Sequence, residues 1–288
     1  MTIDTAYVGA GSADRAVRPP RPPRERSGIP PILLLPALIG LSFLLLPMIG
    51  LLVRAPWTTL DDELRDPLVR EALKLSLYTA TMSTLISLVL GVPIAVVLAQ
   101  GRFRGRGLIR ALVTVPLVLP PVVGGVALLT ALGRKGVVGE RIYDWTGYSL
   151  PFTTNAVIVA ETFVAMPFLI IAVEGALRGA DTRYAEAAAT LGATRWYTFR
   201  RVTLPQVMPG VAAGAVLCWA RALGEFGATV TFAGSLEGKT MVMPSAVYRT
   251  LERGDPNAAI VLSLVLMAVS ILVLASLRER WISPSSAR

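Results

Sequence analysis

Long apolar stretches alternate with short polar ones along the 288 residues of this chain. An α-helix of about 20 apolar residues crosses the ~30 Å hydrocarbon core of a bilayer, because it rises about 1.5 Å per residue. The pattern therefore predicts an all-α membrane protein with six transmembrane helices. The six predicted helices are residues 32–53, 75–98, 109–132, 156–177, 206–232 and 258–277.

The other segments divide the chain into a core and two tails. Residues 1–30 contain five arginines, at positions 15–26, that alternate with prolines, and they show no apolar periodicity, which is typical of a disordered segment. The apolar stretch that follows has no small-residue cleavage site, so a signal peptide is not expected. Residues 31–55 hold the first helix, 70–277 form a core domain with the other five, and 278–288 form a second tail.

Prolines and acidic residues give two of the predicted helices special features. Pro116, Pro120 and Pro121 interrupt the hydrogen-bond ladder of the third helix, so we expect a bend or an unwound turn there. Backbone of that kind faces protein or a wet cavity rather than lipid. Glu161 and Glu174 lie near the two ends of the fourth helix, where we expect both carboxylates to be solvated.

Composition supports a membrane protein and argues against several other functions. Charged residues make up 16% of the chain, against about 25% in soluble domains. Histidine is absent and Cys218 is the only cysteine, so no Cys/His metal site is predicted. Without clustered carboxylates, a membrane-embedded enzyme lacks its usual catalytic residues. No Gly-x-x-x-x-Gly-Lys-Ser/Thr motif occurs, so the chain is not expected to bind ATP in that way.

Lys and Arg indicate how the predicted helices are oriented. The first tail, residues 100–107, residues 178–205 and the last tail carry five, three, five and three of them. The other three loops carry three each, mixed with acidic residues. The positive-inside rule therefore places both termini and the 178–205 loop in the cytoplasm of a multi-pass plasma-membrane protein. The net charge of +9 then reflects orientation rather than a nucleic-acid surface.

The polar loop between the fourth and fifth predicted helices carries helix start and stop signals. Asp181 can cap a helix start, and Gly192 can end that helix in the left-handed conformation. Thr194 can cap a second short helix, Arg195–Arg201, which we expect to stop near Pro205. The sequence thus predicts two short helices joined by a tight corner, too polar to lie in lipid.

This loop also contains a longer spaced motif. Glu-Ala-Ala at 186–188 is followed by three residues, Gly192, nine residues, and Val-Thr-Leu-Pro at 202–205. In that full spacing the loop resembles the cytoplasmic coupling loop of bacterial ABC importer permeases, and a plain amphipathic linker is the alternative. The resemblance implies the type I ABC importer permease fold. It assigns coupling to a partner ATPase to Glu186, Ala187, Ala188, Gly192, Leu204 and Pro205.

The same resemblance implies where the energy of transport comes from. In the family, the coupling loop docks in a cleft of a separate ATPase subunit, which binds ATP and Mg²⁺. No cofactor is therefore expected in this chain. The aromatic residues that follow the corner, Trp196, Tyr197 and Phe199, are interpreted as docking or interfacial side chains rather than a ligand site.

A second motif lies in the fifth predicted helix and the loop after it. Residues 221–229, Arg-Ala-Leu-Gly-Glu-Phe-Gly-Ala-Thr, and 244–248, Pro-Ser-Ala-Val-Tyr, are similar to the molybdate and sulfate permeases, and most of all to the molybdate members. Ser235 departs from the Asn that is common there. The resemblance covers roughly 70–277. It implies import of molybdate, and of tungstate, by a homodimer served by an extracytoplasmic binding protein, with a sulfate/thiosulfate permease as the alternative.

Arg221 and Glu225 are four residues apart, so on one face of the fifth predicted helix they can form an ion pair. An arginine at mid-membrane costs about 2.5–3.5 kcal/mol, so this one should face the bundle interior or a wet cavity. Two roles are open: Arg221 assists passage of an oxyanion, or the pair locks two helices together. An ion-driven secondary transporter, the competing class, would favour inverted repeats and unpaired midplane acids, and neither is found.

Overall fold

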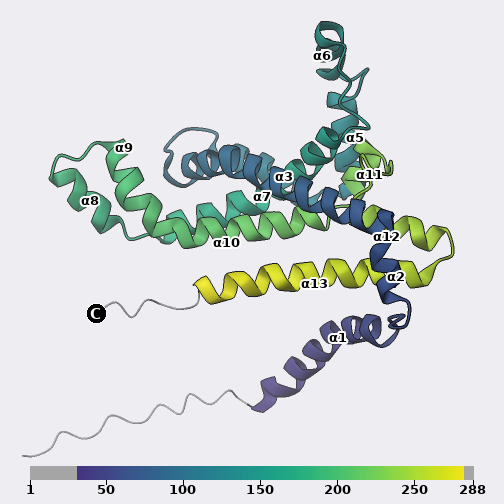
Figure 1. The fold of residues 1–288 in the computed structure, drawn as a ribbon. Coiled ribbons are helices and arrows are strands. Elements are labelled where there is room, and N and C mark those ends of the chain that lie inside the picture. Colours follow the sequence, from purple (N-terminus) through teal and green to yellow (C-terminus); the bar gives the residue numbers. More distant parts are fainter. Residues whose placement is uncertain (1–30, 282–288) are drawn as a thin grey trace, which may run out of the picture. The chain divides into compact units, whose positions relative to one another are not determined.

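The computed structural model describes residues 31–281, which are mostly helical and contain no strand (Figure 1). The predicted disordered tail, residues 1–30, and most of the second tail lie outside this range. The chain divides into two compact units, Met1–Met48 and Ile49–Arg288, and each is described by itself. The first unit contributes the 3-10 turn η1 (Pro31–Leu33) and most of the apolar helix α1.

Besides η1, the described chain contains thirteen α-helices and a π-helical turn, η2. They are α1 (Leu34–Val53), α2 (Leu60–Arg65), α3 (Pro67–Gln100), α4 (Arg106–Val118), α5 (Pro121–Leu132), α6 (Gly139–Thr146), α7 (Thr154–Gly179), α8 (Thr182–Thr190), α9 (Arg195–Thr198), η2 (Phe199–Thr203), α10 (Leu204–Leu223), α11 (Gly227–Ala233), α12 (Met243–Glu252) and α13 (Pro256–Trp281).

Six of these units have the length and composition of membrane spans. Five are single helical stretches: α1, α3, α7, α9 to α10, and α13 up to Val273. The sixth is the pair α4 and α5, which passes the same test when it is taken as one broken span. The predicted all-α fold is therefore confirmed for the described residues, which contain five candidate spans, or six when the bent pair is counted as one. Between the spans, α2, α6 and α12 are short helices in segments that the sequence marked only as loops.

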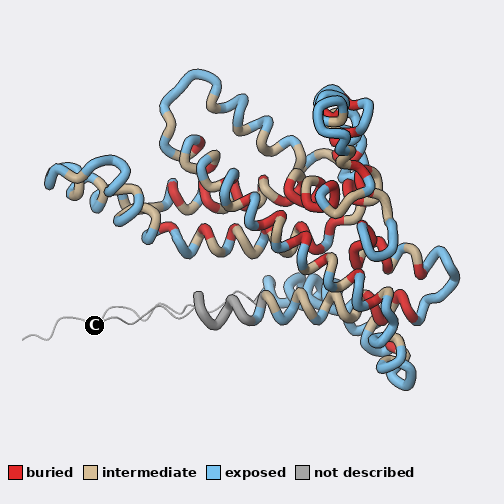
Figure 2. Tube along the Cα trace, turned by 45° about the horizontal axis from the view of Figure 1, so that its top comes forward, coloured by how far each residue is buried: buried red, intermediate tan, exposed pale blue. Residues whose placement is uncertain are grey.

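The second unit is built on three helices that lie side by side, α3, α7 and α10 (Figure 1). Their shared interior contains Ala80, Leu98, Leu169 and Ile170, each at most 1% exposed. Small residues bring the backbones close: a Cβ placed on Gly210 of α10 would lie 2.3 Å from the Cβ of Ala176 on α7. Buried residues recur along the length of the long helices (Figure 2). Small residues allow helix backbones to approach this closely.

The third span is broken where its prolines predicted a bend. The chain bends by 116° between α4 and α5, at Leu119 and Pro120. Both residues have extended backbone, with ψ of 134° and 133°. Pro120 and Pro121 have no N–H to donate to the preceding turn, so α4 ends and Pro121 starts a new helix at the position that tolerates proline.

The fifth span differs from the prediction at both ends. The helix predicted over Arg195–Arg201 does not stop near Pro205, because α9, η2 and α10 form one helical stretch. The π-helical turn widens the chain there, and Pro205 falls in the first turn of α10, where no N–H is needed. The helix predicted over 206–232 is instead interrupted after Leu223, and α11 begins at Gly227.

Candidate functional site

The polar loop between α7 and α10 folds as its capping residues predicted. Asp181 precedes α8, and its carboxylate accepts a hydrogen bond from the backbone N–H of Arg183 at 3.0 Å. The Arg183 guanidinium also donates to this carboxylate, at 2.7 Å from Nη2 to Oδ2. These hydrogen bonds lower the pKa of the Asp181 carboxyl below its ordinary value. The start of α8 is thus fixed by a side chain that stays ionised at neutral pH.

Gly192 makes the corner between α8 and α9. Its φ is +79°, a left-handed conformation that favours glycine. The N–H of Ala193 donates to the carbonyl of Ala188 at 3.0 Å, which closes the end of α8. Thr194 then caps α9 by accepting from the N–H of Tyr197 at 3.3 Å. Both caps and the left-handed corner are confirmed.

This corner exposes apolar side chains that a polar surface does not normally show. Leu191 is 88% exposed, Trp196 68% and Tyr184 63%. Glu186 is also exposed and makes no ion pair within residues 31–281. Large apolar side chains exposed on one short segment are typical of a surface that binds another protein.

The candidate coupling residues do not all lie at this corner. Ala187 is exposed and Ala188 half-buried on α8, whereas Leu204 and Pro205 lie beyond η2, at the start of α10. A hollow of about 590 Å³ separates the loop from the ends of the long helices. Its lining includes Gln100 of α3, Arg178 of α7, Ala185 of α8 and Phe199 of η2.

Glu174 joins α7 to α4. Its carboxylate pairs with Arg178, one turn further along α7, at 2.8 Å and with Arg110 of α4. The Glu174 side chain is only 9% exposed, so the predicted solvated carboxylate is wrong. The guanidinium groups of Arg110 and Arg178 take the place of water around the Glu174 carboxylate. Sequence reasoning missed Arg110, although a single arginine inside an apolar stretch was a signal that it needs a buried partner.

Arg221 and Glu225 form the predicted ion pair, but not on one helix. Nη2 of Arg221 lies 2.6 Å from Oε2 of Glu225, and their side chains are 26% and 1% exposed. Glu225 stands in the break between α10 and α11, and its Oε1 accepts a hydrogen bond from the N–H of Ala228 at 2.8 Å. The carboxylate therefore links the last turn of α10 to the first turn of α11.

Glu161 is buried in the middle of the second unit. It is 1% exposed, so its predicted solvation is also wrong. The hydroxyl of Thr79 on α3 donates to its Oε1 at 2.8 Å, while Oε2 has no hydrogen-bond partner among the described residues. The sequence placed Glu161 near a membrane face because it lies close to the end of its apolar stretch. The long α3 covers that end of α7.

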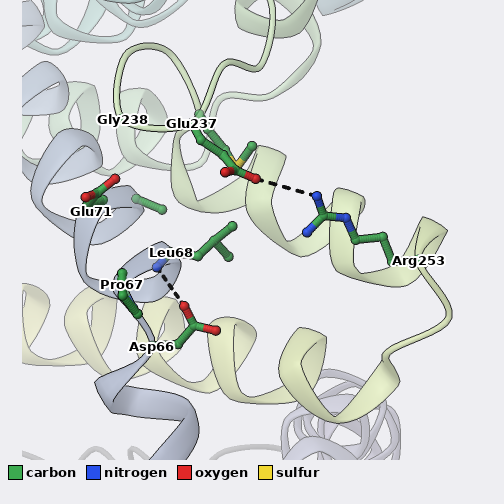
Figure 3. Close-up of a pocket in the computed structure, with 9 residues that line it drawn as sticks. Asp66, Pro67, Leu68, Glu71, Glu237, Gly238 and Arg253 are labelled. Carbon is green, nitrogen blue, oxygen red and sulfur yellow. Dashed lines mark hydrogen bonds and ion pairs between the residues drawn. The ribbon is translucent and has the colours of Figure 1, made fainter.

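A second hollow, of about 440 Å³, lies at the N-terminal end of α3 (Figure 3). Asp66, Glu71 and Glu237 line it, and Glu237 pairs with Arg253 at 3.5 Å. Acidic residues crowd this region: burial first, and then neighbouring carboxylates, raise the pKa of the Glu63 carboxyl. Within residues 31–281, no group of three or more acidic or Cys side chains is placed to hold a metal ion.

The two hollows mark opposite ends of α3. Glu71 lines one and Ala99 lines the other. At 1.5 Å per residue, the helix between them is roughly 40 Å long, close to the thickness of a bilayer with its headgroups. The acidic hollow and the loop between α7 and α10 therefore lie at opposite ends of a helix that is long and apolar enough to cross a membrane.

Several known transport proteins are similar in sequence over most of the chain. The molybdenum transport system permease protein ModB of Mycobacterium tuberculosis is 47% identical over 247 residues, covering 85% of this chain and 92% of the relative. ModB of Escherichia coli is 40% identical over 207 residues, covering 70% and 90%. The sulfate transport system permease protein CysT of Escherichia coli is 35% identical over 237 residues, covering 81% and 85%.

Solved structures share the fold. A bacterial alginate ABC transporter, in complex with a periplasmic protein bound to alginate pentasaccharide, contains a chain that matches with a TM-score of 0.69 at 20% identity, covering 86% of this chain and 92% of that one. The inward-facing MetNI methionine ABC transporter matches with a TM-score of 0.61 at 20% identity, covering 74% and 94%. Residues 87–287 match the family described as binding-protein-dependent transport system inner membrane component, so this chain, with its permease fold, belongs to that family.

Proposed function

We propose that this chain is the permease subunit of an ATP-driven importer of molybdate, and of the similar oxyanion tungstate, in the plasma membrane. The observation that carries the substrate is the similarity to the ModB permeases, at 40–47% identity over most of the chain. The motif at residues 221–229 and the break that it forms between α10 and α11 are consistent with it. Family membership makes the chain a transport subunit rather than an enzyme.

The partners follow from the coupling loop and from the solved relatives. A dimer of ATPase subunits, which bind ATP and Mg²⁺, would receive α8 and the exposed side chains of Tyr184, Leu191 and Trp196. Glu186, Ala187, Ala188 and Gly192 would contact or shape that interface, and Leu204 and Pro205 would join it to α10. A second, identical permease and an extracytoplasmic molybdate-binding protein complete the proposed assembly. Closure of the ATPase dimer would then move the two α8 helices together and switch the side of the membrane to which the path opens.

Sulfate or thiosulfate is the second candidate substrate. The sulfate permeases remain similar, at 32–35% identity, and cover 81–82% of this chain. The ion-driven secondary transporter has no comparable support, because the family couples transport to a binding protein. Most of the discrimination between oxyanions should reside in that binding protein, so the permease itself contributes less to it.

Reconstituted uptake tests the substrate. Vesicles containing this chain, its ATPase and the cognate binding protein should accumulate molybdate and tungstate when ATP is supplied, and sulfate more weakly, because sulfate is the smaller anion. ATP hydrolysis should require both the permease and the separate ATPase. Uptake of sulfate without uptake of molybdate would overturn the molybdate assignment and leave only the family.

Cysteine labelling tests the orientation, with the loop and both termini proposed to lie in the cytoplasm. In a Cys218→Ser background, a cysteine at exposed Thr182 should react with a membrane-impermeant maleimide only after the cytoplasmic side is opened. A cysteine at exposed Lys239, near the acidic hollow, should react from outside. Reaction of Thr182→Cys in intact cells would exclude docking of an ATPase on this loop. The Cys218→Ser parent supplies the background signal.

A further inference from the structure

Two of the helix breaks lie next to each other. The first residues of α5 and α11 are in contact, because a Cβ on Gly227 would lie 2.9 Å from the Cβ of Pro121 and 3.1 Å from the N of Val122. The break at Leu119 and Pro120 precedes one helix, and the break at Gly224 to Phe226 precedes the other. Two points at which the chain changes direction thus share one location.

From these breaks α5 and α11 run in the same direction with their backbones touching. One turn further along, a Cβ on Gly125 would lie 2.6 Å from the Cβ of Thr231 and 2.9 Å from the carbonyl oxygen of Ala228. The nearest neighbours of Gly125 and Gly227 are mainly backbone atoms and β-carbons, so little side-chain volume that could re-pack lies between the two helices. Moving α5 away from α11, or sliding one along the other, would therefore leave an unfilled gap between them, which a change of side-chain rotamer could not fill.

The contacts of this pair with the rest of the unit are of another kind. Phe232 of α11 and Phe163 of α7 belong to one apolar cluster, and a Cβ on Gly124 would lie 3.2 Å from the ring of Phe163. Aromatic and aliphatic side chains of this sort can shift across a neighbouring helix while they stay buried. Part of the surface between the pair and α7 is therefore made of side chains that can shift, beside the buried Ala156, Ala160, Ala228 and Ala233.

Glu225 connects the start of α11 to the end of α10. Parallel helices bring their partial positive N-terminal ends side by side, which is unfavourable. The Glu225 carboxylate lies at this place, accepts from the N–H of Ala228 and pairs with Arg221 at the end of α10. It places a negative charge at the start of α11 and ties α11 to α10 through one side chain, which is the arrangement of a hinge.

We propose that α5 and α11 move as one rigid body during the transport cycle, turning about the two adjacent breaks relative to α4 and α10. This inference rests on the proposed function only in requiring an ATP-driven change of conformation. The pair would carry the motion that begins at the coupling loop into the middle of the membrane, where the oxyanion path must open and close.

Distances between spin labels in the assembled transporter test this. Label pairs at Val126 and Val230, within the pair, and at Val126 with Leu112 and Val230 with Leu217, across each break, are measured without nucleotide and with ATP trapped. Excess unlabelled permease keeps labelled copies to one per complex, and Cys218→Ser removes the native thiol. We expect the distance within the pair to stay the same and both distances across the breaks to shift.

Two results would overturn the proposal: a change within the pair as large as the changes across the breaks, or no change across the breaks in a complex that hydrolyses ATP. A complex that shows the expected distances but takes up no molybdate would count against the proposed substrate alone. As an independent variant, Gly125→Ala should lower uptake per assembled transporter about tenfold or more, because it forces two backbones apart. Gly175→Ala, in α7 with no atom within 4 Å of its Cβ, should have wild-type uptake.

Discussion

Arg221→Ala is expected to lower the yield of folded permease several-fold. Glu225 is 1% exposed, and its charge is balanced by the guanidinium 2.6 Å away. Removing one partner of a buried pair costs about 3–5 kcal/mol, and the lower end applies here because the Arg221 side chain is 26% exposed. The measurement is the fraction of detergent-solubilised permease that elutes as an assembled complex. Arg253→Ala removes an arginine from a pair whose side chains are both 53% exposed and should change that fraction little.

A double variant separates the two roles left open for Arg221. Arg221→Met with Glu225→Gln removes both charges but keeps an oxygen that can accept from the N–H of Ala228, which Glu225→Leu would lose. We expect this variant to recover both folded yield and molybdate uptake. One oxygen of the Glu225 carboxylate contacts Arg221 of α10 and the other contacts Ala228 of α11, so its role is to link the two helices. A folded double variant that hydrolyses ATP without moving substrate would instead show that the cation of Arg221 assists the oxyanion.

Gly192→Val is expected to abolish most ATP-driven uptake while the chain still inserts and folds. Its φ of +79° is costly for a β-branched residue, about 1–3 kcal/mol, and the corner between α8 and α9 must shift to relieve that cost. No atom lies within 4 Å of a Cβ at this position, so steric contact contributes nothing. Uptake and ATP hydrolysis per assembled transporter should both fall.

Gly254→Val is the matched control for this variant. Gly254 also has a left-handed φ, of +76°, and open space around its Cβ, but it lies in the loop between α12 and α13. The backbone strain should be similar and uptake nearly normal. On the same loop as Gly192, Glu186→Lys reverses an unpaired exposed charge and should lower uptake, whereas Asp144→Lys on exposed α6 should not. Equal loss in Gly192→Val and Gly254→Val would mean that only stability was affected.

Local features of this protein could be predicted from the sequence because short-range physics decides them. The caps at Asp181 and Thr194 and the left-handed Gly192 depend on residues within one helical turn. The break after Leu119 follows from adjacent prolines that cannot donate hydrogen bonds. Six spans follow from the length of apolar stretches against the thickness of a bilayer.

Long-range contacts decided what the sequence could not. Glu161 and Glu174 were predicted to be solvated because their sequence neighbours mark a membrane face, but their environments come from Thr79 on α3 and Arg110 on α4. These partners lie 82 and 64 residues away, so no local pattern connects them. A charged residue near the end of an apolar stretch is compatible with water or with a buried partner, and only the packing distinguishes the two.

In the fifth span, the sequence predicted one feature of the motif at residues 221–229, and the tertiary structure decided another. Spacing alone determined that Arg221 and Glu225 meet, because residues four apart are neighbours on a helix and remain within reach past its end. Tertiary structure decided that the helix stops between them and restarts at Gly227, where Pro121 and Val122 of α5 leave room only for glycine. The sequence by itself thus determined the spans, the caps and the pairs of neighbouring residues. The meeting of two helix breaks depended on backbone contacts between distant segments, which no pattern of hydrophobic and polar residues encodes.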